Sequence, residues 1–449
     1  MTNPEDIGRT ESLASGFEHI TQGFDPATDD FPTKKRDCVH FDFRLTESQR
    51  VGLPLQDINL SSYRFWPLLG FTIKNRKQVF GPHGEELGFK VKPREIKFGS
   101  HYDAAVLELY GRHLSKLYEA ELSRLEITEC VLAYRSNIGD NITQSKGFFD
   151  LISQNPNCIV AAFDISKFFD RINHKVLKAN LKQVLGTDSL SDDHYNVFKN
   201  LTRYSWVDKE KLIERLKDVK QRPPGRICSP EVFEQKVRKP KPKIIEKNPD
   251  PFGIPQGSPI SGLYANISLL NFDVAVNNYI KSIGGFYRRY SDDIAIYLPQ
   301  NQSFDDAESF IRNELKRIDL ELNESKTDIS FFKITSGKIF CDKPFQYLGF
   351  IFDGKRVLIR PSSIQRYYKK MRKGIFGKIS AAKNQNIPSS KIYLRELYKK
   401  YTHYGKKRNF PRYAYRASQI FDSPQIRKQI STHIDHFRKN ISDAIQKYY

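Results

Sequence analysis

The sequence predicts an α+β fold, to which buried strands and helices both contribute. A continuous apolar run from Cys158 to Phe163 is typical of a strand covered on both faces. Alternating apolar residues from Ile294 to Leu298 indicate a second strand with one buried face. Helical spacing near the C-terminus indicates a helix with the apolar positions Tyr393, Leu394, Leu397 and Tyr401. The composition, 39% hydrophobic and 28% charged over 449 residues, is that of a globular protein.

The chain begins with an acidic segment, residues 1–35, which we expect to be a partly ordered arm. Arg9 is its one cation before Thr33, against the acidic residues Glu5, Asp6, Glu11, Glu18, Asp25, Asp29 and Asp30. A solvated tail is the default expectation, and shielding of a basic groove or contact with another protomer is the alternative.

Asp164 stands where the apolar run of residues 158–163 stops. The end of a buried strand is a stiff support from which a catalytic side chain can emerge. Downstream, Asp292 and Asp293 are adjacent at a tight turn between strand-like segments. Neighbouring carboxylates raise each other's pKa, so they are best tolerated where a divalent cation takes up the charge. A solvated turn is the alternative for the pair alone. Two-metal phosphoryl transfer needs several converging carboxylates, and Asp164 is the natural third member.

Two later stretches are basic. Residues 221–226 and 236–243 are broken by prolines, so we expect an extended loop or ribbon that faces nucleic acid, or else a solvated loop. From Pro361 to Tyr449 the chain has 21 basic and 4 acidic residues, a net of +17 out of +21 for the whole chain. Tyrosines and phenylalanines are spread through this tail, which predicts a helical domain that binds a polyanion. Ser389 and Ser390 are suited to capping one of its helices.

The cysteines and the apolar segments predict a cytoplasmic protein. The five cysteines lack the paired spacing of a zinc site, which favours reduced thiols. No apolar run approaches membrane-spanning length, and the start lacks the features of a signal peptide.

Three segments, in this order, resemble motifs A, B and C of reverse transcriptases: Phe163-Asp164-Ile-Ser-Lys-Phe-Phe169-Asp170, Pro255-Gln256-Gly257-Ser258 and Tyr290-Ser291-Asp292-Asp293. Each is weak alone, but the ordered set is specific. Similarity runs from about Arg94 to Phe352. Residues 133–141 and the tail segment 404–417 look most like the abortive-infection and other defence-associated reverse transcriptases of prokaryotes, which are related to those of retrons and group II introns.

This resemblance implies a right-hand polymerase. Fingers would span residues 36–155, a ferredoxin-like palm with the catalytic carboxylates residues 156–352, and a basic helical thumb residues 353–449. The palm would carry the basic, proline-containing insertion at about residues 205–250. No nuclease, integrase or RNase H domain is expected after the thumb.

The resemblance also implies roles for single residues. Asp164, Asp292, Asp293 and the backbone carbonyl of Ile165 would hold two Mg²⁺ ions, for which Mn²⁺ is a substitute. Lys326 lies in the segment 320–327, which looks like motif D, and would donate a proton to the departing pyrophosphate.

The nucleotide and the primer would be held by further segments. Phe169 occupies the steric-gate position that excludes a 2′-hydroxyl, which favours DNA synthesis over RNA synthesis. Gln256 and Gly257 would lie against the new base pair, and Arg94 would bind the triphosphate. Around Arg94 the chain departs from the family, because Glu95 stands where a proline is usual. The segment 345–350 is similar to motif E, whose residues Tyr347, Leu348 and Gly349 would form the primer grip.

The implied activity is RNA-directed DNA synthesis with dNTPs as substrates and DNA as product. The template would be a structured non-coding RNA, and the subgroup resemblance implies antiviral defence against phage. No membrane partner is expected, while a homo-oligomer or a second defence protein stays open as a partner.

Three alternatives remain open at this point. The protein could be a template-independent or protein-primed DNA polymerase of the same fold, or an RNA-synthesising relative. The third alternative is a non-catalytic RNA-binding protein in which the polymerase fold is only a scaffold. Retention of the three acids, Phe169, Lys326 and Gln256 argues against a scaffold.

Overall fold

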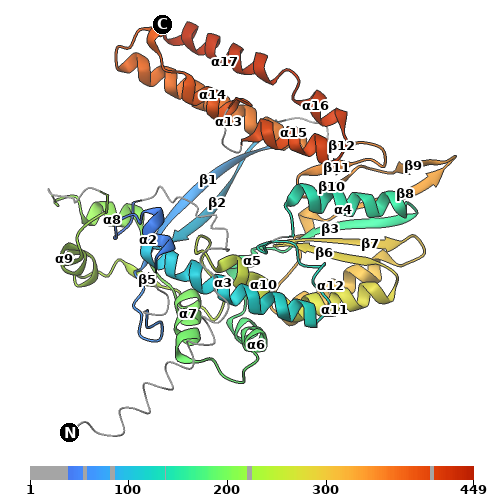
Figure 1. Ribbon diagram of the computed structural model, residues 1–449, viewed down its shortest axis with the longest axis horizontal. Coiled ribbons are helices and arrows are strands. Elements are labelled where there is room, and N and C mark those ends of the chain that lie inside the picture. The colour runs from blue at the N-terminus through green and yellow to red at the C-terminus, as the bar shows by residue number, and fades with distance from the viewer. Residues whose placement is uncertain (1–38, 54–57, 81–85, 137, 220–224, 405–408) are drawn as a thin grey trace. The chain divides into compact units, whose positions relative to one another are not determined.

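The strands that carry the acidic residues belong to one five-stranded sheet (Figure 1). The computed structural model describes residues 39–53, 58–80, 86–136, 138–219, 225–404 and 409–449. The chain forms two compact units. The first unit comprises Met1–Arg135, Ser166–Ala275 and Asn313–Glu321, and the second comprises Ser136–Ile165, Val276–Arg312 and Leu322–Tyr449.

The five-stranded sheet is the centre of the second unit. Its order is β6-β7-β3-β8-β9, with every pair antiparallel. Its strands are β3 (Cys158–Asp164), β6 (Phe286–Tyr290), β7 (Asp293–Pro299), β8 (Asp328–Thr335) and β9 (Lys338–Cys341). The predicted strands at 158–163 and 294–298 are therefore confirmed, and the apolar run of β3 is explained by its central position.

The connections of this sheet are ferredoxin-like. After β3, the chain passes through the segment Ser166–Ser268, which belongs to the first unit, and then continues with helix α11 (Leu270–Ser282), the β6–β7 hairpin, helix α12 (Phe304–Arg317) and β8. This order of elements, with β3 between β7 and β8, is the β-α-β-β-α-β arrangement.

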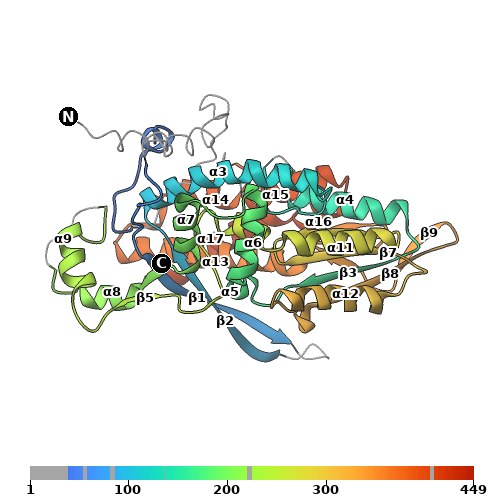
Figure 2. The same cartoon turned by 90° about the horizontal axis from the view of Figure 1, so that it is seen from below.

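Helices cover both faces of the sheet. On one face, α4 (Asn141–Gln154) places Phe148, Phe149 and Ile152 in a core with residues of β3, β7 and β8. On the other face, the ring of Phe163 stacks on Phe304 at the start of α12, with centroids 6.2 Å apart. Figure 2 shows α12 against the sheet from this side. The α4 core also includes a three-stranded sheet and two helices: β10 (Phe345–Tyr347), β11 (Phe350–Phe352), β12 (Val357–Ile359), α15 (Phe410–Ile420) and α16 (Pro424–Gln429).

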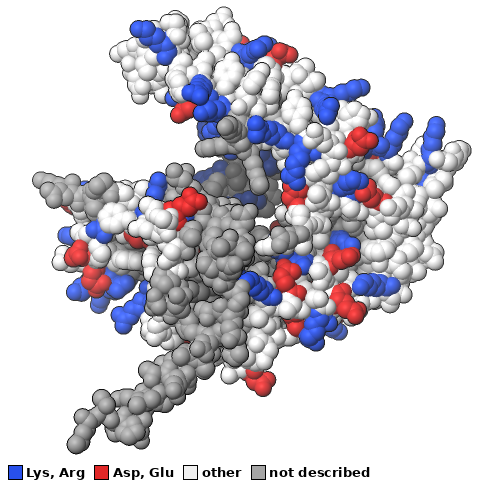
Figure 3. Space-filling model, in the orientation of Figure 1, with Lys and Arg blue, Asp and Glu red and all other residues white. Residues whose placement is uncertain are grey.

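The C-terminal region also contains three helices that share a core of their own. They are α13 (Pro361–Asn384), α14 (Arg395–Tyr401) and α17 (His433–Tyr448), which bury Met371, Ile375, Ile379 and Phe437 together. Lys and Arg side chains outnumber acidic ones over these helices in Figure 3. The predicted helical, basic tail is confirmed. The predicted cap is wrong, because Ser389 and Ser390 lie in a 3-10 turn (Ser389–Lys391) and α14 begins only at Arg395.

The first unit is built on a second sheet and a set of helices. The sheet order is β2-β1-β4-β5, in which β1 and β4 are parallel. The elements of the first unit are α2 (Glu47–Val51), β1 (Leu68–Phe80), β2 (Glu86–Phe98), α3 (His101–Arg124), α5 (Phe168–Arg171), α6 (His174–Leu185), α7 (Asp192–Thr202), β4 (Ser205–Asp208), α8 (Lys209–Arg215), α9 (Pro230–Val232), a π-helix (Phe233–Arg238), β5 (Ile245–Lys247) and α10 (Ser261–Ser268).

The basic stretch of residues 236–243 is not the extended loop that we predicted. Its first residues lie in the π-helix, because Phe233 and Val237 bury their side chains in a core with Leu212 and Leu216 of the α8 segment. Pro240 and Pro242 follow the helix, so they end it without preventing it. The upstream residues 221–224 lie outside the described residues.

Other expectations from the sequence are only partly open to inspection. The acidic arm of residues 1–35, Cys38 and Gly405 lie outside the described residues. In the part of the chain that the structure describes, Cys130, Cys158, Cys228 and Cys341 form no disulfide bond. No helix of the described chain is both long and apolar enough to cross a membrane. The α+β class is confirmed, whereas the division into fingers, palm and thumb stays a prediction.

Candidate active site

Two of the predicted metal-binding acids, Asp292 and Asp293, lie at the turn between β6 and β7. Ser291, in the turn, has a φ of 62°, a left-handed conformation that is uncommon outside glycine. Arg289 supports the turn from the protein interior. Its side chain is fully buried, and its Nη1 donates a hydrogen bond to the carbonyl oxygen of Ser291 at 3.1 Å. This support fixes the backbone that carries Asp292 and Asp293.

Asp164 lies beside this turn, at the end of the neighbouring strand. It is the register partner of Asp293 in the β3–β7 pair. The next backbone group on the same strand, the N–H of Ile165, donates to the carbonyl oxygen of Asp292 at 2.9 Å. The two acidic segments are therefore tied to each other by the sheet, although 128 positions separate Asp164 from Asp292 along the chain.

Lys326 and Asn323 complete the surroundings of Asp164. Lys326 Nζ donates to Asp164 Oδ1, and Asn323 Nδ2 donates to Oδ2 at 3.3 Å. The backbone N–H of Asn323 also donates to the carbonyl oxygen of Asp164 at 2.7 Å. The structure thus brings Lys326 to the acid cluster, as expected from the sequence, and adds Asn323, which the prediction did not include.

Burial and neighbouring carboxylates raise the pKa values of Asp292 and Asp293. Burial, followed by repulsion from Asp164, raises the pKa of Asp292 above its ordinary value. Burial and the charges of Asp292 and Asp164 raise the pKa of Asp293 to about 7, although part of this side chain is exposed. Lys326 and Arg360 act in the opposite direction on Asp293. The site therefore concentrates negative charge that its own cations do not fully offset.

This donor set fits divalent metal ions. Mg²⁺ prefers carboxylate oxygens, and a cation stabilises the charged form of acids whose pKa is raised by burial and by nearby negative charge. Among the described residues, no three His, Cys, Asp or Glu side chains already form a cluster with the geometry to hold a metal ion. One of the two Asp164 oxygens is engaged by Lys326, so its carboxylate would have to change partner to bind a metal. Ile165 is buried, and its carbonyl is the backbone group that follows Asp164.

The predicted primer-grip residues lie at the end of β10, which is Tyr347, and in the turn to β11, which is Leu348 and Gly349. Leu348 has a φ of 45°, and Asn141 Nδ2 donates to its carbonyl oxygen at 3.1 Å and to Tyr413 Oη at 2.8 Å. Gly349 accepts a hydrogen bond from the N–H of Arg360 at 3.0 Å. Tyr347 is buried, and burial followed by the charge of Asp293 raises its pKa. This turn is thus held by α4, by α15 and by the residue after β12.

The remaining predicted residues belong to the first unit. Phe169 is half-buried, and its carbonyl oxygen accepts a hydrogen bond from the N–H of Ile254 at 2.8 Å. Gln256 accepts one from the N–H of Lys97 at 3.0 Å. Gly257 has a φ of 134°, and a Cβ there would lie 2.7 Å from the carbonyl oxygen of Lys97. Arg94 is exposed on β2, three positions before Lys97.

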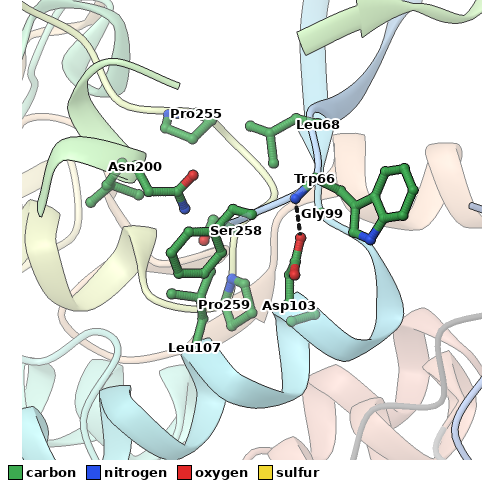
Figure 4. Close-up of a pocket in the computed structure, with 12 residues that line it drawn as sticks. Trp66, Leu68, Gly99, Asp103, Leu107, Asn200, Pro255, Ser258 and Pro259 are labelled. Carbon is green, nitrogen blue, oxygen red and sulfur yellow. Dashed lines mark hydrogen bonds between the residues drawn. The ribbon is translucent and has the colours of Figure 1, made fainter. Parts of the chain in front are cut away.

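A small pocket lies behind the loop that carries Gln256 and Gly257. Its lining includes Trp66, Asp103, Ser258 and Pro259. The backbone N–H of Trp66 donates a hydrogen bond to the carboxylate of Asp103 at 2.9 Å (Figure 4). The cavity volume of about 10 Å³ has room for about one water molecule. It is therefore part of the support of the loop and too small for a nucleotide.

The sequence reasoning missed Asn323, Arg289 and Arg360 around the acids. Asn323 lies inside the segment 320–327, and Arg289 directly precedes the segment Tyr290–Asp293, so their polar character was a usable signal. Arg360 lies outside any motif, and its proximity to the site follows from its hydrogen bond to Gly349 and from its charge, which lowers the pKa of Asp293.

Comparison with known proteins identifies the family. Residues 104–352 match the profile described as "Reverse transcriptase (RNA-dependent DNA polymerase)". No curated protein matches the sequence significantly.

Several solved structures are similar at low identity. A telomerase of Candida tropicalis, truncated from its C-terminal domain, is 13% identical with a TM-score of 0.36, over 62% of this chain and 55% of that one. A telomerase of Candida albicans in complex with a TWJ fragment of telomeric RNA is 10% identical with a TM-score of 0.39, over 87% and 62% of the two chains. The corresponding complex from Candida tropicalis is 13% identical with a TM-score of 0.39, over 86% and 65%. The chain thus spans less than two thirds of the length of these structures.

The profile match covers more than half of the chain. The protein belongs to the reverse transcriptase (RNA-dependent DNA polymerase) family.

Proposed function

We propose that this chain is an RNA-directed DNA polymerase that joins deoxynucleotides at a site formed by Asp164, Asp292 and Asp293. The observation that carries the proposal is the register pairing of Asp164 with Asp293, with Ile165 hydrogen-bonded to Asp292. These contacts bring together acids that a two-metal polymerase requires, in a chain of the reverse transcriptase family.

In the proposed reaction, the 3′-hydroxyl of a primer loses its proton to water, its oxygen forms a bond to the α-phosphorus of a dNTP, and the bond between that phosphorus and pyrophosphate breaks. Asp164, Asp292, Asp293 and the carbonyl of Ile165 would hold two Mg²⁺ ions, which lower the pKa of the hydroxyl and neutralise the leaving group. Lys326 would give a proton to the departing pyrophosphate, and Asn323 orients the carboxylate of Asp164.

The first unit would supply selection of the nucleotide. Phe169 would close the space beside the sugar C2′, so that a ribonucleotide fits poorly. Gln256 and Gly257 would contact the new base pair, and the close approach of Gly257 to Lys97 leaves no room for a side chain at position 257. Arg94, exposed on β2, would bind the triphosphate.

The β10–β11 turn would hold the end of the primer. Its backbone is fixed by Asn141 and Arg360, so the turn of Tyr347, Leu348 and Gly349 offers a rigid support. A rigid support is useful because small errors in the position of the 3′-hydroxyl slow in-line attack strongly.

Primer extension tests this activity. Purified protein would be incubated with Mg²⁺, dNTPs and a DNA primer on an RNA template, beside Asp292→Asn and the control Asp305→Asn, an exposed acid on α12. We expect extension by the wild type and by Asp305→Asn, and a loss of at least about 10³-fold for Asp292→Asn. Equal extension by all three proteins would contradict the assignment of the site.

The same assay separates the alternatives. Extension without any template would favour a template-independent polymerase, and DNA that stays attached to protein after phenol extraction would favour protein priming. RNA binding without synthesis on any template, including RNA that copurifies, would favour the scaffold alternative.

We propose further that the cellular role is antiviral defence with a dedicated non-coding RNA, in the cytoplasm. Support comes from the sequence resemblance to defence-associated reverse transcriptases. A phage challenge of cells that carry the wild type, Asp292→Ala or Asp293→Ala tests this role. Protection by the wild type alone is expected, and equal protection by all three would remove DNA synthesis from the mechanism. A heterogeneous population of copurifying RNA would count against a dedicated one.

A further inference from the structure

Tyr134 adopts an unfavourable backbone conformation with a half-exposed ring. Its φ is 58°, and its side chain is 51% exposed. An aromatic residue in the left-handed region costs of order 1 kcal/mol, and such residues persist where the surroundings over-determine them. Burial does not explain this conformation, since the residue as a whole is 51% exposed.

Neighbouring residues hold the loop on both sides of Tyr134. The next residue, Arg135, has a side chain that is 1% exposed and is bound by Glu119 at 2.8 and 2.5 Å. Arg135 also donates to the carbonyl oxygen of Val131 at 2.6 Å. On the other side, Asn266 Nδ2 donates to the carbonyl oxygen of Ala133 at 2.7 Å. These bonds, all within the first unit, fix the direction in which the ring of Tyr134 leaves the backbone.

The ring of Tyr134 lies between Gly262 and Phe169. It covers Gly262 so closely that a Cβ there would lie 2.5 Å from Cδ1 and 2.6 Å from Cγ of the tyrosine. Its edge meets the ring of Phe169 in a T-shaped contact, with centroids 6.5 Å apart and planes at 85°. Edge-to-face contacts of this kind are favourable and directional.

We infer that Tyr134 is a specificity-determining positioning residue, which holds the ring of Phe169 in the orientation that excludes ribonucleotides. This inference rests on the proposed function, in which Phe169 is the wall beside the sugar. Phe169 is only half-buried, and its ring meets two aromatic neighbours: Phe168, with centroids 5.5 Å apart, and Tyr134. Phe168 is adjacent in the chain, so Tyr134 is the neighbour that ties the rotamer of Phe169 to a separate, fixed loop. Gly262 provides the space in which the tyrosine ring lies.

Steady-state incorporation of a single dNTP and of the matching rNTP on a primed RNA template tests the inference. The readout is the ratio of the two kcat/KM values for the wild type, Tyr134→Ala, Tyr134→Phe and Gly262→Ala. We expect the preference for dNTP to fall about tenfold in Tyr134→Ala, chiefly through better use of rNTP. Tyr134→Phe keeps the ring and is expected to keep the ratio. Gly262→Ala displaces the ring, so a fall in the ratio is expected although Tyr134 itself is unchanged.

A double variant distinguishes positioning from a direct role. Because the tyrosine acts through Phe169, Tyr134→Ala is expected to leave the ratio unchanged in a Phe169→Ala background. Equal losses of dNTP and rNTP incorporation in Tyr134→Ala, or a full further effect in the double variant, would overturn the inference. Thermal melting of each variant identifies those that fold. Extension of dNTPs by the wild type is the separate test of the proposed function, and a lowered ratio in Phe169→Ala tests the gate itself.

Discussion

Lys326 is held at the acid cluster by its bond to Asp164. Its Nζ binds Asp164, and its side chain is 44% exposed, so it can change partner without the cost of leaving a buried site. The 3-10 turn Glu324–Lys326 begins directly after Asn323, whose backbone N–H is bonded to Asp164. One short segment therefore positions both the amide and the amine.

Replacing Lys326 with methionine is expected to slow synthesis. The change removes the proposed proton donor, so kcat is expected to fall about 10²-fold with a smaller change in KM for dNTP. Single-nucleotide incorporation measures both constants. Lys333→Met, which removes an exposed lysine from β8, is the control. An unchanged kcat in Lys326→Met would remove this lysine from the chemistry.

His40 is a buried residue whose protonation opposes folding. The backbone N–H of Phe41 donates to His40 Nδ1 at 2.8 Å, so Nε2 carries the proton that faces the carbonyl oxygen of Phe98 at 3.3 Å. Burial lowers the pKa of His40 from 6.5 to about 4, against the smaller effect of Asp42. The unfolded chain thus binds the proton more readily, and stability decreases as pH falls from 6.5 towards 4.

Replacing His40 with glutamine is expected to remove this pH dependence. Relative to the wild type, the variant's free energy of unfolding should improve by about 2 kcal/mol between pH 7 and pH 5. Urea unfolding of both proteins at the two pH values provides the measurement. Asp103 acts in the opposite sense, because burial raises its pKa to about 6, but it is present in both proteins and cancels in the comparison. A difference independent of pH would show that His40 is not buried in its neutral form.

At the scale of elements, the β10–β11 turn depends on one amide side chain. Asn141, at the start of α4, bonds both Leu348 and Tyr413, while the preceding Asp140 pairs with Arg416 at 2.5 Å. These contacts join α4, the turn and α15 within the second unit.

Replacing Asn141 with alanine is expected to loosen this turn. The loss of two hydrogen bonds should cost about 1–2 kcal/mol of stability, measured by urea unfolding. In the extension assay, the KM for primed template is expected to rise while the KM for dNTP changes less. Asn440→Ala, which removes a bond to a carbonyl of its own helix, is the control. Unchanged stability and primer affinity in Asn141→Ala would exclude this role.

The π-helix and the turn after it form a basic surface in the first unit. Lys236, Arg238, Lys239, Lys241 and Lys243 are all exposed. Lys243 Nζ donates to the carbonyl oxygens of Arg238 and Lys239 at 2.6 and 3.0 Å, which ties the turn to the helix. The cations are therefore presented by folded backbone instead of by a free loop.

Removing three of these charges is expected to weaken RNA binding in a salt-dependent manner. In a Lys236→Gln, Lys239→Gln, Lys241→Gln variant, the slope of log K against log salt should decrease by roughly 2–3, if each lysine meets a phosphate. Filter binding of a structured RNA at several salt concentrations measures this slope. A matched variant at Lys175, Lys281 and Lys316, which are exposed elsewhere, should keep it. If the two variants have equal slopes of log K against log salt, these lysines do not contact RNA and only face solvent.

The sequence predicts elements where one signal dominates. The apolar run of β3 and the alternation of β7 give strands because both lie at the centre of a sheet, where burial decides the conformation. The start of α14 was misjudged because Ser389 and Ser390 lie inside a separate 3-10 turn that forms before the helix, and neither caps it. The π-helix was missed because prolines and lysines outweighed Phe233 and Val237, whose burial depends on the distant α8.

On the scale of the whole molecule, most contacts that build the site join distant parts of the sequence. Asp164 meets Asp293 through strand register and meets Lys326 across 162 positions. Asn141 reaches Leu348 across 207 positions. Motif order implied that the acids converge, but the bonds of Arg289, Asn323 and Arg360 follow from the fold and could not be read from the chain. The net charge of +21 suits a nucleic-acid partner and is independent of these details.

The central claim is that Asp164, Asp292 and Asp293 hold two catalytic metal ions. A crystal structure with primed RNA template, a non-hydrolysable dNTP and Mn²⁺, with an anomalous difference map at the manganese edge, tests it most directly. The account predicts two peaks within coordination distance of Asp164 and Asp292, one of them also reachable by Asp293, and the loss of at least one peak in Asp292→Asn. Manganese peaks bound by other residues, with these three carboxylates unliganded, would contradict it.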